Sequence, residues 1–146
     1  MKIKKDFKWA MAHVLEDHKG LCKNVHGHNY RAVIDVEAEE LIDGMVMDFK
    51  DLKEIVNEVI IEPMDHAFGY NKNNEKSKQV AEFLEKELDQ KTFEFGFRAT
   101  AENMAKFIYE TLNGYFLTRE IKVTCSKVSL FETDDSCAVY EGKDAN

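Results

Sequence analysis

The sequence predicts an α+β domain in which helices cover one face of an antiparallel sheet. Two strand-like segments come first, three segments with apolar residues at helical spacing follow, and two further strand-like segments come last. Strands and helices that are grouped in runs, without strict alternation, are typical of this class. The length of 146 residues fits one domain, which we expect to span residues 1–146. The uncovered face of the sheet then needs a partner, and we expect subunit association to supply it.

The strands are predicted from side chains that alternate between two faces of an extended chain. Residues 3–15 show this pattern, and residues 28–39 show it most clearly. A polar loop with one glycine, residues 16–25, separates these two strands. Residues 121–132 and 136–141 are predicted as two further strands that a short polar turn connects.

Three helices are predicted between the two pairs of strands. The first begins after Asp48, which is a good N-cap residue, and ends before Pro63, because the residue before a proline disfavours the helical region. The second covers residues 77–88. The third begins after Thr100, another N-cap residue, and stops at Gly114.

Charge and composition exclude several classes of function. The net charge is −8 and the pI is near 5.2, which argues against binding to nucleic-acid backbones or to anionic lipid. No run approaches the roughly 20 apolar residues of a membrane span, and the N-terminus lacks the pattern of a signal peptide. The three cysteines form no Cys-x-x-Cys motif and no disulfide framework, so we expect a cytoplasmic protein.

Three histidines are the strongest candidates for metal ligands. His26 and His28 are two residues apart, so an extended backbone points both rings to the same side. His13 ends the preceding strand and would lie beside them if the two strands form a hairpin. Three imidazoles around an open fourth position form a catalytic zinc site. Each histidine taken alone is more often a polar or core residue.

Cys22 precedes His26 by four residues and is a candidate catalytic base. A nearby metal lowers the pKa of a thiol, so a thiolate close to zinc could accept a proton. Two other interpretations stay open, namely a buried structural thiol and a fourth zinc ligand. A site closed by one cysteine and three histidines would be structural rather than catalytic.

Two carboxylates complete the candidate site residues. Asp65 could orient His66 as a proton relay, although a polar turn after a helix is the simpler interpretation. Glu132 ends a strand face that is otherwise apolar, where a carboxylate is costly unless it is paired. It could accept hydrogen bonds from a ring N–H and an adjacent amine, as on a guanine-like or pterin ring, or it could be a solvated turn residue.

In this order the motifs resemble the 6-pyruvoyl-tetrahydropterin synthase / 6-carboxy-tetrahydropterin synthase family. They are spread over nearly the whole chain, and together they are specific although each alone is weak. The matching pieces are Phe7…Ala12-His13, Cys22 with His26-Gly27-His28-Asn29-Tyr30, Met47-Asp48-Phe49…Leu52-Lys53, Asp65-His66, Thr100-Ala101-Glu102-Asn103 and Phe131-Glu132-Thr133.

The resemblance implies a tunnelling fold, in which a four-stranded antiparallel sheet carries helices on one side. Trimers of such chains close their sheets into a barrel, and two trimers stack into a homohexamer with active sites between subunits. By resemblance, Zn²⁺ is bound by His13, His26 and His28, Cys22 is the catalytic base, Asp65 and His66 form a proton relay, and Glu132 binds the pterin ring.

Within the family, the three residues between Cys22 and His26 resemble the carboxytetrahydropterin synthases of the queuosine pathway, whereas pyruvoyl enzymes usually have five. The resemblance implies a lyase that converts 7,8-dihydroneopterin triphosphate to 6-carboxy-5,6,7,8-tetrahydropterin with release of acetaldehyde and triphosphate. One alternative is a 6-pyruvoyl-tetrahydropterin synthase, which eliminates triphosphate without carbon–carbon cleavage. Another is a non-catalytic zinc- or pterin-binding protein.

The chain departs from the family pattern at two places. Ala99 stands where relatives usually have proline before the third helix. The stretch between His66 and Thr100 is longer than in many relatives and contains the helix predicted over residues 77–88, to which the sequence assigns no role. Despite the net charge of −8, a triphosphate needs local cations, and the basic residues near the motifs are Lys23, Arg31 and Lys127.

Overall fold

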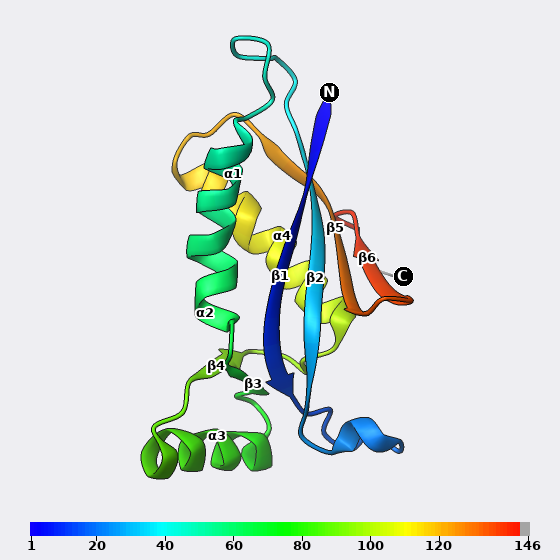
Figure 1. Cartoon of the computed structure of the whole chain (residues 1–146), viewed down its shortest axis with the longest axis vertical. Coiled ribbons are helices and arrows are strands. Elements are labelled where there is room, and N and C mark those ends of the chain that lie inside the picture. The colour runs from blue at the N-terminus through cyan, green and yellow to red at the C-terminus, as the bar shows by residue number, and fades with distance from the viewer. Residues whose placement is uncertain (144–146) are drawn as a thin grey trace.

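The computed structural model describes residues 1–143, so the last three residues of the expected domain lie outside it. A curled sheet has the strand order β4-β3-β1-β2-β5-β6 and carries helices on one face (Figure 1). The strands are β1 (Lys2–His13), β2 (His26–Glu37), β3 (Phe68–Asn71), β4 (Thr92–Phe95), β5 (Thr124–Thr133) and β6 (Ser136–Tyr140). The helices are α1 (Phe49–Val56), η2 (Asn57–Ile61), α2 (Glu62–Met64), α3 (Glu75–Leu88), α4 (Ala101–Thr118) and the 3-10 turn η1 (Leu21–Lys23).

The long antiparallel hairpin of β1 and β2 is the centre of the fold. Its register runs from Lys2 opposite Glu37 to His13 opposite His26. Alternation along both strands turns Trp9 and Tyr30 toward the helices, where their rings stack 5.4 Å apart. The hairpin predicted from alternating side chains is therefore present, and it ends where the three histidines begin.

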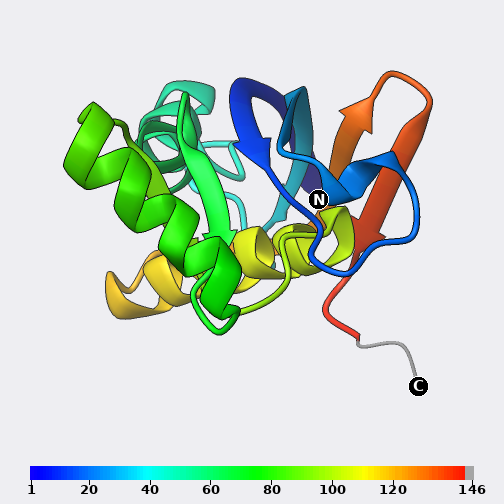
Figure 2. The ribbon, with the colours of Figure 1, turned by 90° about the horizontal axis from the view of Figure 1, so that it is seen from below.

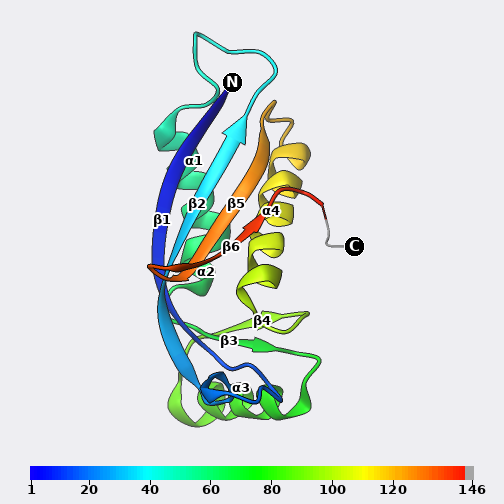
Figure 3. The same cartoon turned by 90° about the vertical axis from the view of Figure 1, so that its right-hand side faces the viewer.

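The helix layer buries apolar side chains against one face of this sheet. The continuous segment from α1 through α2 and the long α4 lie behind the strands in Figure 3, which leaves the opposite face open. The two predicted N-caps are present, because the Asp48 carboxylate accepts a hydrogen bond from Lys50 N–H and the Thr100 hydroxyl accepts one from Asn103 N–H. The fully buried helix residues include Leu52, Val56, Ile60, Met104, Ile108 and Leu112.

The prediction of a four-stranded antiparallel sheet is wrong, because the sheet has six strands and is mixed. The two additional strands, β3 and β4, run parallel to each other, and β3 runs parallel to β1. Parallel neighbours need a crossover connection, which α3 provides. Strands of four residues are too short for alternation to distinguish them from a loop.

Two predicted helix ends are also wrong. Pro63 lies inside the helical segment, in the first turn of α2 directly after the π-helical turn η2, where its missing N–H is not needed. Gly114 does not end α4, which continues to Thr118. A glycine inside a helix costs about 1 kcal/mol relative to alanine, and the buried neighbours Leu112 and Phe116 offset that cost.

The sheet has two open edges and one open face. Beyond its bridge to β3 at Ala12 and His13, β1 has no further strand partner on that side among residues 1–143. The last strand at the other edge is β6. The open face carries charged side chains such as Lys4, Lys8 and Arg31. None of the helices in the described residues is both long and apolar enough to cross a membrane.

Candidate metal centre and active site

The structure brings the three predicted histidines together at one end of the β1–β2 hairpin. His13 is the last residue of β1 and lies opposite His26, the first residue of β2, and His28 follows on the same face. One ring nitrogen from each of the three lies within 4.8 Å of the others. Their rings form edge contacts with centroids 4.5–5.1 Å apart. This geometry suits three ligands of one metal ion.

Backbone carbonyl groups fix the tautomers of two of these rings. The Nδ1 atom of His13 is 2.8 Å from the carbonyl oxygen of Ala99, and the Nδ1 atom of His26 is 2.7 Å from that of Asn24. A carbonyl oxygen only accepts, so each ring donates through Nδ1 and each neutral ring has a lone pair on Nε2. The two Nε2 atoms face each other at 3.0 Å. Such facing lone pairs repel unless a cation lies between them, so the residues present fit a metal ion.

Burial favours the neutral form of two of these imidazoles, His13 and His28. Loss of solvent lowers the pKa of His13 to about 4, and the hydrogen bond to Ala99 only partly opposes this effect. Burial also lowers the pKa of His28, although the charge of Glu132 works in the other direction. Neutral rings are the form that binds a metal, so His13 and His28 are in their ligand form at neutral pH.

Glu132 lies beside this cluster at the end of β5. Its Oε1 atom is 3.9 Å from Nε2 of His13, is buried, and has no hydrogen-bond partner in the structure. Burial, together with the charge of Glu132 and a hydrogen bond to it, raises the pKa of Tyr30. Glu132 also lines a hollow of about 360 Å³ with Arg98 and Thr100. A buried acceptor without a partner beside a hollow is suited to a ligand that donates hydrogen bonds.

Cys22 lies in η1, in the loop that connects the two strands of the hairpin. Its thiol is free and half-buried, and its carbonyl oxygen accepts a hydrogen bond of 3.0 Å from Leu15 N–H. Within residues 1–143, the group of side chains able to hold a metal comprises the three histidines and does not include Cys22. The geometry therefore favours an open three-histidine site over a site that a cysteine closes.

Asp65 and His66 form a pair, as predicted, but the structure does not bring them into the histidine cluster. Oδ1 of Asp65 is 2.9 Å from Nδ1 of His66, and the bend that adjacent residues need is present because His66 has φ +61°. Partial burial opposes ionisation of Asp65, but hydrogen bonds from Ala10 N–H and His66 lower its pKa overall. His66 is largely exposed and lines a second hollow, at the edge of β1, together with Ala10, Asn29 and His28.

The three basic residues near the motifs also lie apart from one another. Lys23 lines a hollow beside the start of α3. Arg31 pairs with Asp6 and stacks on the Phe131 ring, and Lys127 pairs with Glu141. Arg31 and Lys127 belong to the open face, so neither faces the histidine cluster of its own chain.

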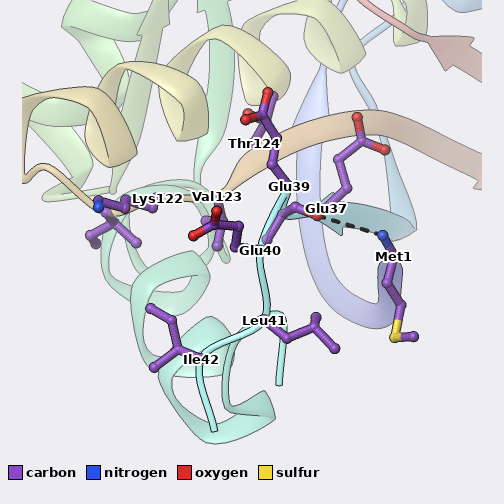
Figure 4. Close-up of a pocket in the computed structure, with 11 residues that line it drawn as sticks. Met1, Glu37, Glu39, Glu40, Leu41, Ile42, Lys122, Val123 and Thr124 are labelled. Carbon is purple, nitrogen blue, oxygen red and sulfur yellow. Dashed lines mark hydrogen bonds between the residues drawn. The ribbon is translucent and has the colours of Figure 1, made fainter. Parts of the chain in front are cut away.

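A hollow of about 710 Å³ (Figure 4) lies at the opposite end of the molecule from the histidine cluster. Acidic and aliphatic side chains line it, and the Met1 amino group donates a 3.5 Å hydrogen bond to the carbonyl oxygen of Ala38 at its rim. It contains none of the residues that the sequence singled out for chemistry.

Sequence reasoning missed three residues around the site. Tyr30 faces the histidine cluster, because its spacing of two from His28 places both rings on the same face, where they form an edge contact. Thr100 was predicted as a helix cap and as part of a family motif but not as a site residue, although it lines the hollow beside Glu132. Arg98 lies two residues before Thr100 and shows no local signal, because its position depends on contacts with distant parts of the chain.

Comparison with known proteins places these features in a family. The family model described as 6-pyruvoyl tetrahydropterin synthase matches residues 2–143. A protein from Haemophilus influenzae named 6-carboxy-5,6,7,8-tetrahydropterin synthase is 42% identical over 144 residues, which cover 96% of this chain and 98% of that protein. A protein of the same name from Aquifex aeolicus is 36% identical over 82% of this chain and 75% of its own length.

Relatives named for the pyruvoyl reaction are also similar. The human 6-pyruvoyl tetrahydrobiopterin synthase is 32% identical over 85% of this chain and 72% of its own length. The structure of the Caenorhabditis elegans 6-pyruvoyl tetrahydropterin synthase superposes with a TM-score of 0.66 at 24% identity, over 98% of this chain and 96% of that chain, which shows the shared fold. The chain therefore belongs to the 6-pyruvoyl tetrahydropterin synthase family.

Proposed function

We propose that this protein is a zinc-dependent 6-carboxy-5,6,7,8-tetrahydropterin synthase of the queuosine pathway. It would convert 7,8-dihydroneopterin triphosphate and one water molecule to 6-carboxy-5,6,7,8-tetrahydropterin, acetaldehyde and triphosphate. The observation that carries the proposal is the distance of 3.0 Å between Nε2 of His13 and Nε2 of His26, within a cluster of three histidines. The relatives that carry this enzyme's name support the choice of reaction, and the three free cysteines fit a cytoplasmic location.

Zinc would be held by His13, His26 and His28, with its fourth position open to substrate. Bound there, zinc supplies a Lewis acid that polarises side-chain oxygens of the substrate. Nδ1 of His13 and of His26 donate to the carbonyl oxygens of Ala99 and Asn24, and these contacts hold the two rings in the orientation that a metal requires.

Glu132 would orient the pterin ring. Its buried Oε1 without a partner accepts a hydrogen bond from the ring N–H or the adjacent amine, and the hollow beside it admits the ring. A ring held in this way keeps the reacting side chain close to the histidine cluster, which is a positioning effect.

The Cys22 thiolate would remove a proton from the substrate side chain, and His66 would move a proton to or from the ring. Asp65 supports the second role, because its carboxylate accepts a hydrogen bond from the His66 ring and is ionised at neutral pH. Neither role requires Cys22 or His66 to be a metal ligand.

The site would be completed by neighbouring subunits. The Asp65–His66 pair lies at the edge of β1 and outside the histidine cluster of its own chain, and both edges of the sheet have unpaired backbone groups. We propose that trimers close their sheets into a barrel and that two trimers form a homohexamer. The Asp65–His66 pair of one subunit then faces the histidine cluster of another.

Mixing two inactive variants tests this arrangement. His26→Ala and His66→Ala are each expected to be inactive alone, and hexamers reassembled from an equal mixture should recover about a quarter of wild-type activity, because a quarter of the shared sites are intact. Activity is measured before and after reassembly, with each variant reassembled alone as the control. No recovery in the mixture would mean that each site is built from one chain.

The reaction itself is tested by product analysis. The zinc-loaded protein is incubated with 7,8-dihydroneopterin triphosphate, and the products are identified by mass spectrometry together with an acetaldehyde assay. Carboxytetrahydropterin with acetaldehyde is the expected result. Pyruvoyl-tetrahydropterin without acetaldehyde would favour the reaction named for the human relative. Bound zinc without turnover would indicate a binding protein.

A further inference from the structure

The loop that carries Cys22, residues 14–25, is exposed over much of its length. Several of its backbone hydrogen bonds are internal, including Leu15 N–H to the Cys22 carbonyl oxygen and Asn24 N–H to that of Leu21. Side chains from Asp17 to Leu21 are exposed. A loop of this kind needs anchors if it is to hold a reactive group in one place.

Glu16 connects this loop to two distant parts of the chain. The Ser77 hydroxyl donates a hydrogen bond of 2.5 Å to Oε1 of Glu16. The guanidinium of Arg98 donates a hydrogen bond of 2.6 Å to the Glu16 carbonyl oxygen. Ser77 belongs to α3 and Arg98 to the segment before α4. The loop and α3 both lie at the lower end of the molecule in Figure 1, which is the end that faces the viewer in Figure 2.

We propose that Glu16, Ser77 and Arg98, here called the Glu16 anchor, are positioning residues that hold the Cys22 loop against the histidine cluster. This inference rests on the proposed function, because it takes Cys22 as the base. The connection is short: Glu16 follows Leu15, and Leu15 N–H is hydrogen-bonded to the Cys22 carbonyl oxygen. The anchor also gives a role to the longer stretch between His66 and Thr100.

The packing of α3 supports a role beyond stabilisation. Of its 14 residues only Ser77 and Ala81 are buried, while Val80 and Phe83 are exposed. A helix with so small a buried face adds little hydrophobic stabilisation. One of its two buried side chains is the hydroxyl that binds Glu16, so the contact with the Cys22 loop is a principal interaction of α3.

The anchor also contains buried charged groups that are not fully paired. Oε2 of Glu16 and Nε of Arg98 are buried without hydrogen-bond partners in the structure. Such atoms cost free energy that an apolar contact would avoid, and they point to a function that needs polar groups there. Arg98 also lines the hollow beside Glu132, so the same side chain contacts both the Cys22 loop and the proposed ring pocket.

Hydrogen exchange measures the anchor without reference to activity. In the full-length protein, Ser77→Ala is expected to speed exchange of amides in residues 15–24 by about tenfold, because one hydrogen bond that holds the loop is lost. Lys78→Ala, an exposed neighbour on α3, is the matched control and should leave this exchange unchanged. Unchanged exchange in Ser77→Ala would overturn the anchor.

Steady-state kinetics then test whether the loop position matters for turnover. Ser77→Ala and Glu16→Ala are expected to lower kcat about 10- to 100-fold with little change in KM, metal content or Tm, since a shift of about 1 Å costs up to ~10²-fold. Glu16→Gln keeps an acceptor for Ser77 and should recover most of kcat. Glu16→Ala removes the same hydrogen bond from the other side, so it tests the anchor even if Ser77→Ala does not fold.

Cys22→Ala separates failure of the anchor from failure of the proposed function. If Cys22→Ala is inactive while Ser77→Ala and Glu16→Ala keep full kcat, the anchor does not position Cys22 and the inference is overturned. If Cys22→Ala keeps full activity, the role of Cys22 in the proposed function is wrong, whatever the exchange rates of the loop.

Discussion

His26→Ala is expected to lose bound metal and, with it, essentially all turnover. The change removes one of three ligands and leaves Nε2 of His13 without the atom that faces it at 3.0 Å. The loss of affinity should exceed the roughly 10–100-fold that follows when only the hydrogen-bond partner of a ligand is removed. The metal content of the purified variant, measured by elemental analysis, checks this expectation.

A second histidine variant is the matched control. It shows whether metal is lost because a ligand is removed or because any imidazole is removed. His18 is exposed, and its Nδ1 accepts a hydrogen bond from Gly20 N–H within the loop. His18→Ala should therefore retain its full metal content. Full zinc occupancy in His26→Ala, with the fold intact, would contradict the three-histidine site.

The sequence predicted the parts of the fold that depend on long local patterns. The hairpin of β1 and β2 extends over twelve residues on each side, so its alternation is unambiguous. Asp48 and Thr100 begin helices by a contact with a residue two or three positions away, which local sequence can encode. The four-residue strands β3 and β4 are stabilised by pairing in parallel with each other, although α3 separates them in the sequence. No local sequence pattern predicts such a pairing.

The same distinction applies to the candidate site. The hairpin register aligns His13 with His26, so the three histidines could be grouped from strand spacing alone. Glu16 contacts Ser77 across 61 positions and Arg98 across 82, and these contacts follow only from the packed fold. The Asp65–His66 pair was predicted, but its place at the edge of β1 was not. That place depends on the hydrogen bond from Ala10 N–H to the Asp65 carboxylate, which joins residues 55 positions apart.

Cys22→Ala is expected to lower turnover by roughly 10²–10⁴-fold while the fold and the bound metal remain, because this is the usual contribution of one general acid–base group. The thiol is half-buried, lies in a loop and is absent from the metal-holding group of the described residues. Burial raises the pKa of the Cys125 thiol to about 12, so that cysteine stays protonated at neutral pH and cannot serve as the base. Rates under single-turnover conditions, together with metal content, check the expectation.

The choice among the three possible roles of Cys22 follows from two measurements on this variant. Loss of turnover with metal retained identifies a base. Loss of both turnover and metal would indicate a fourth ligand and a closed structural site. Retention of both would leave a structural thiol, and another group would have to remove the substrate proton. Cys137→Ala, which changes an exposed free cysteine on β6 that also lines the hollow beside Glu132, is the control for metal content and should keep its metal. Metal content therefore decides between base and ligand, which the spacing of Cys22 and His26 alone leaves open.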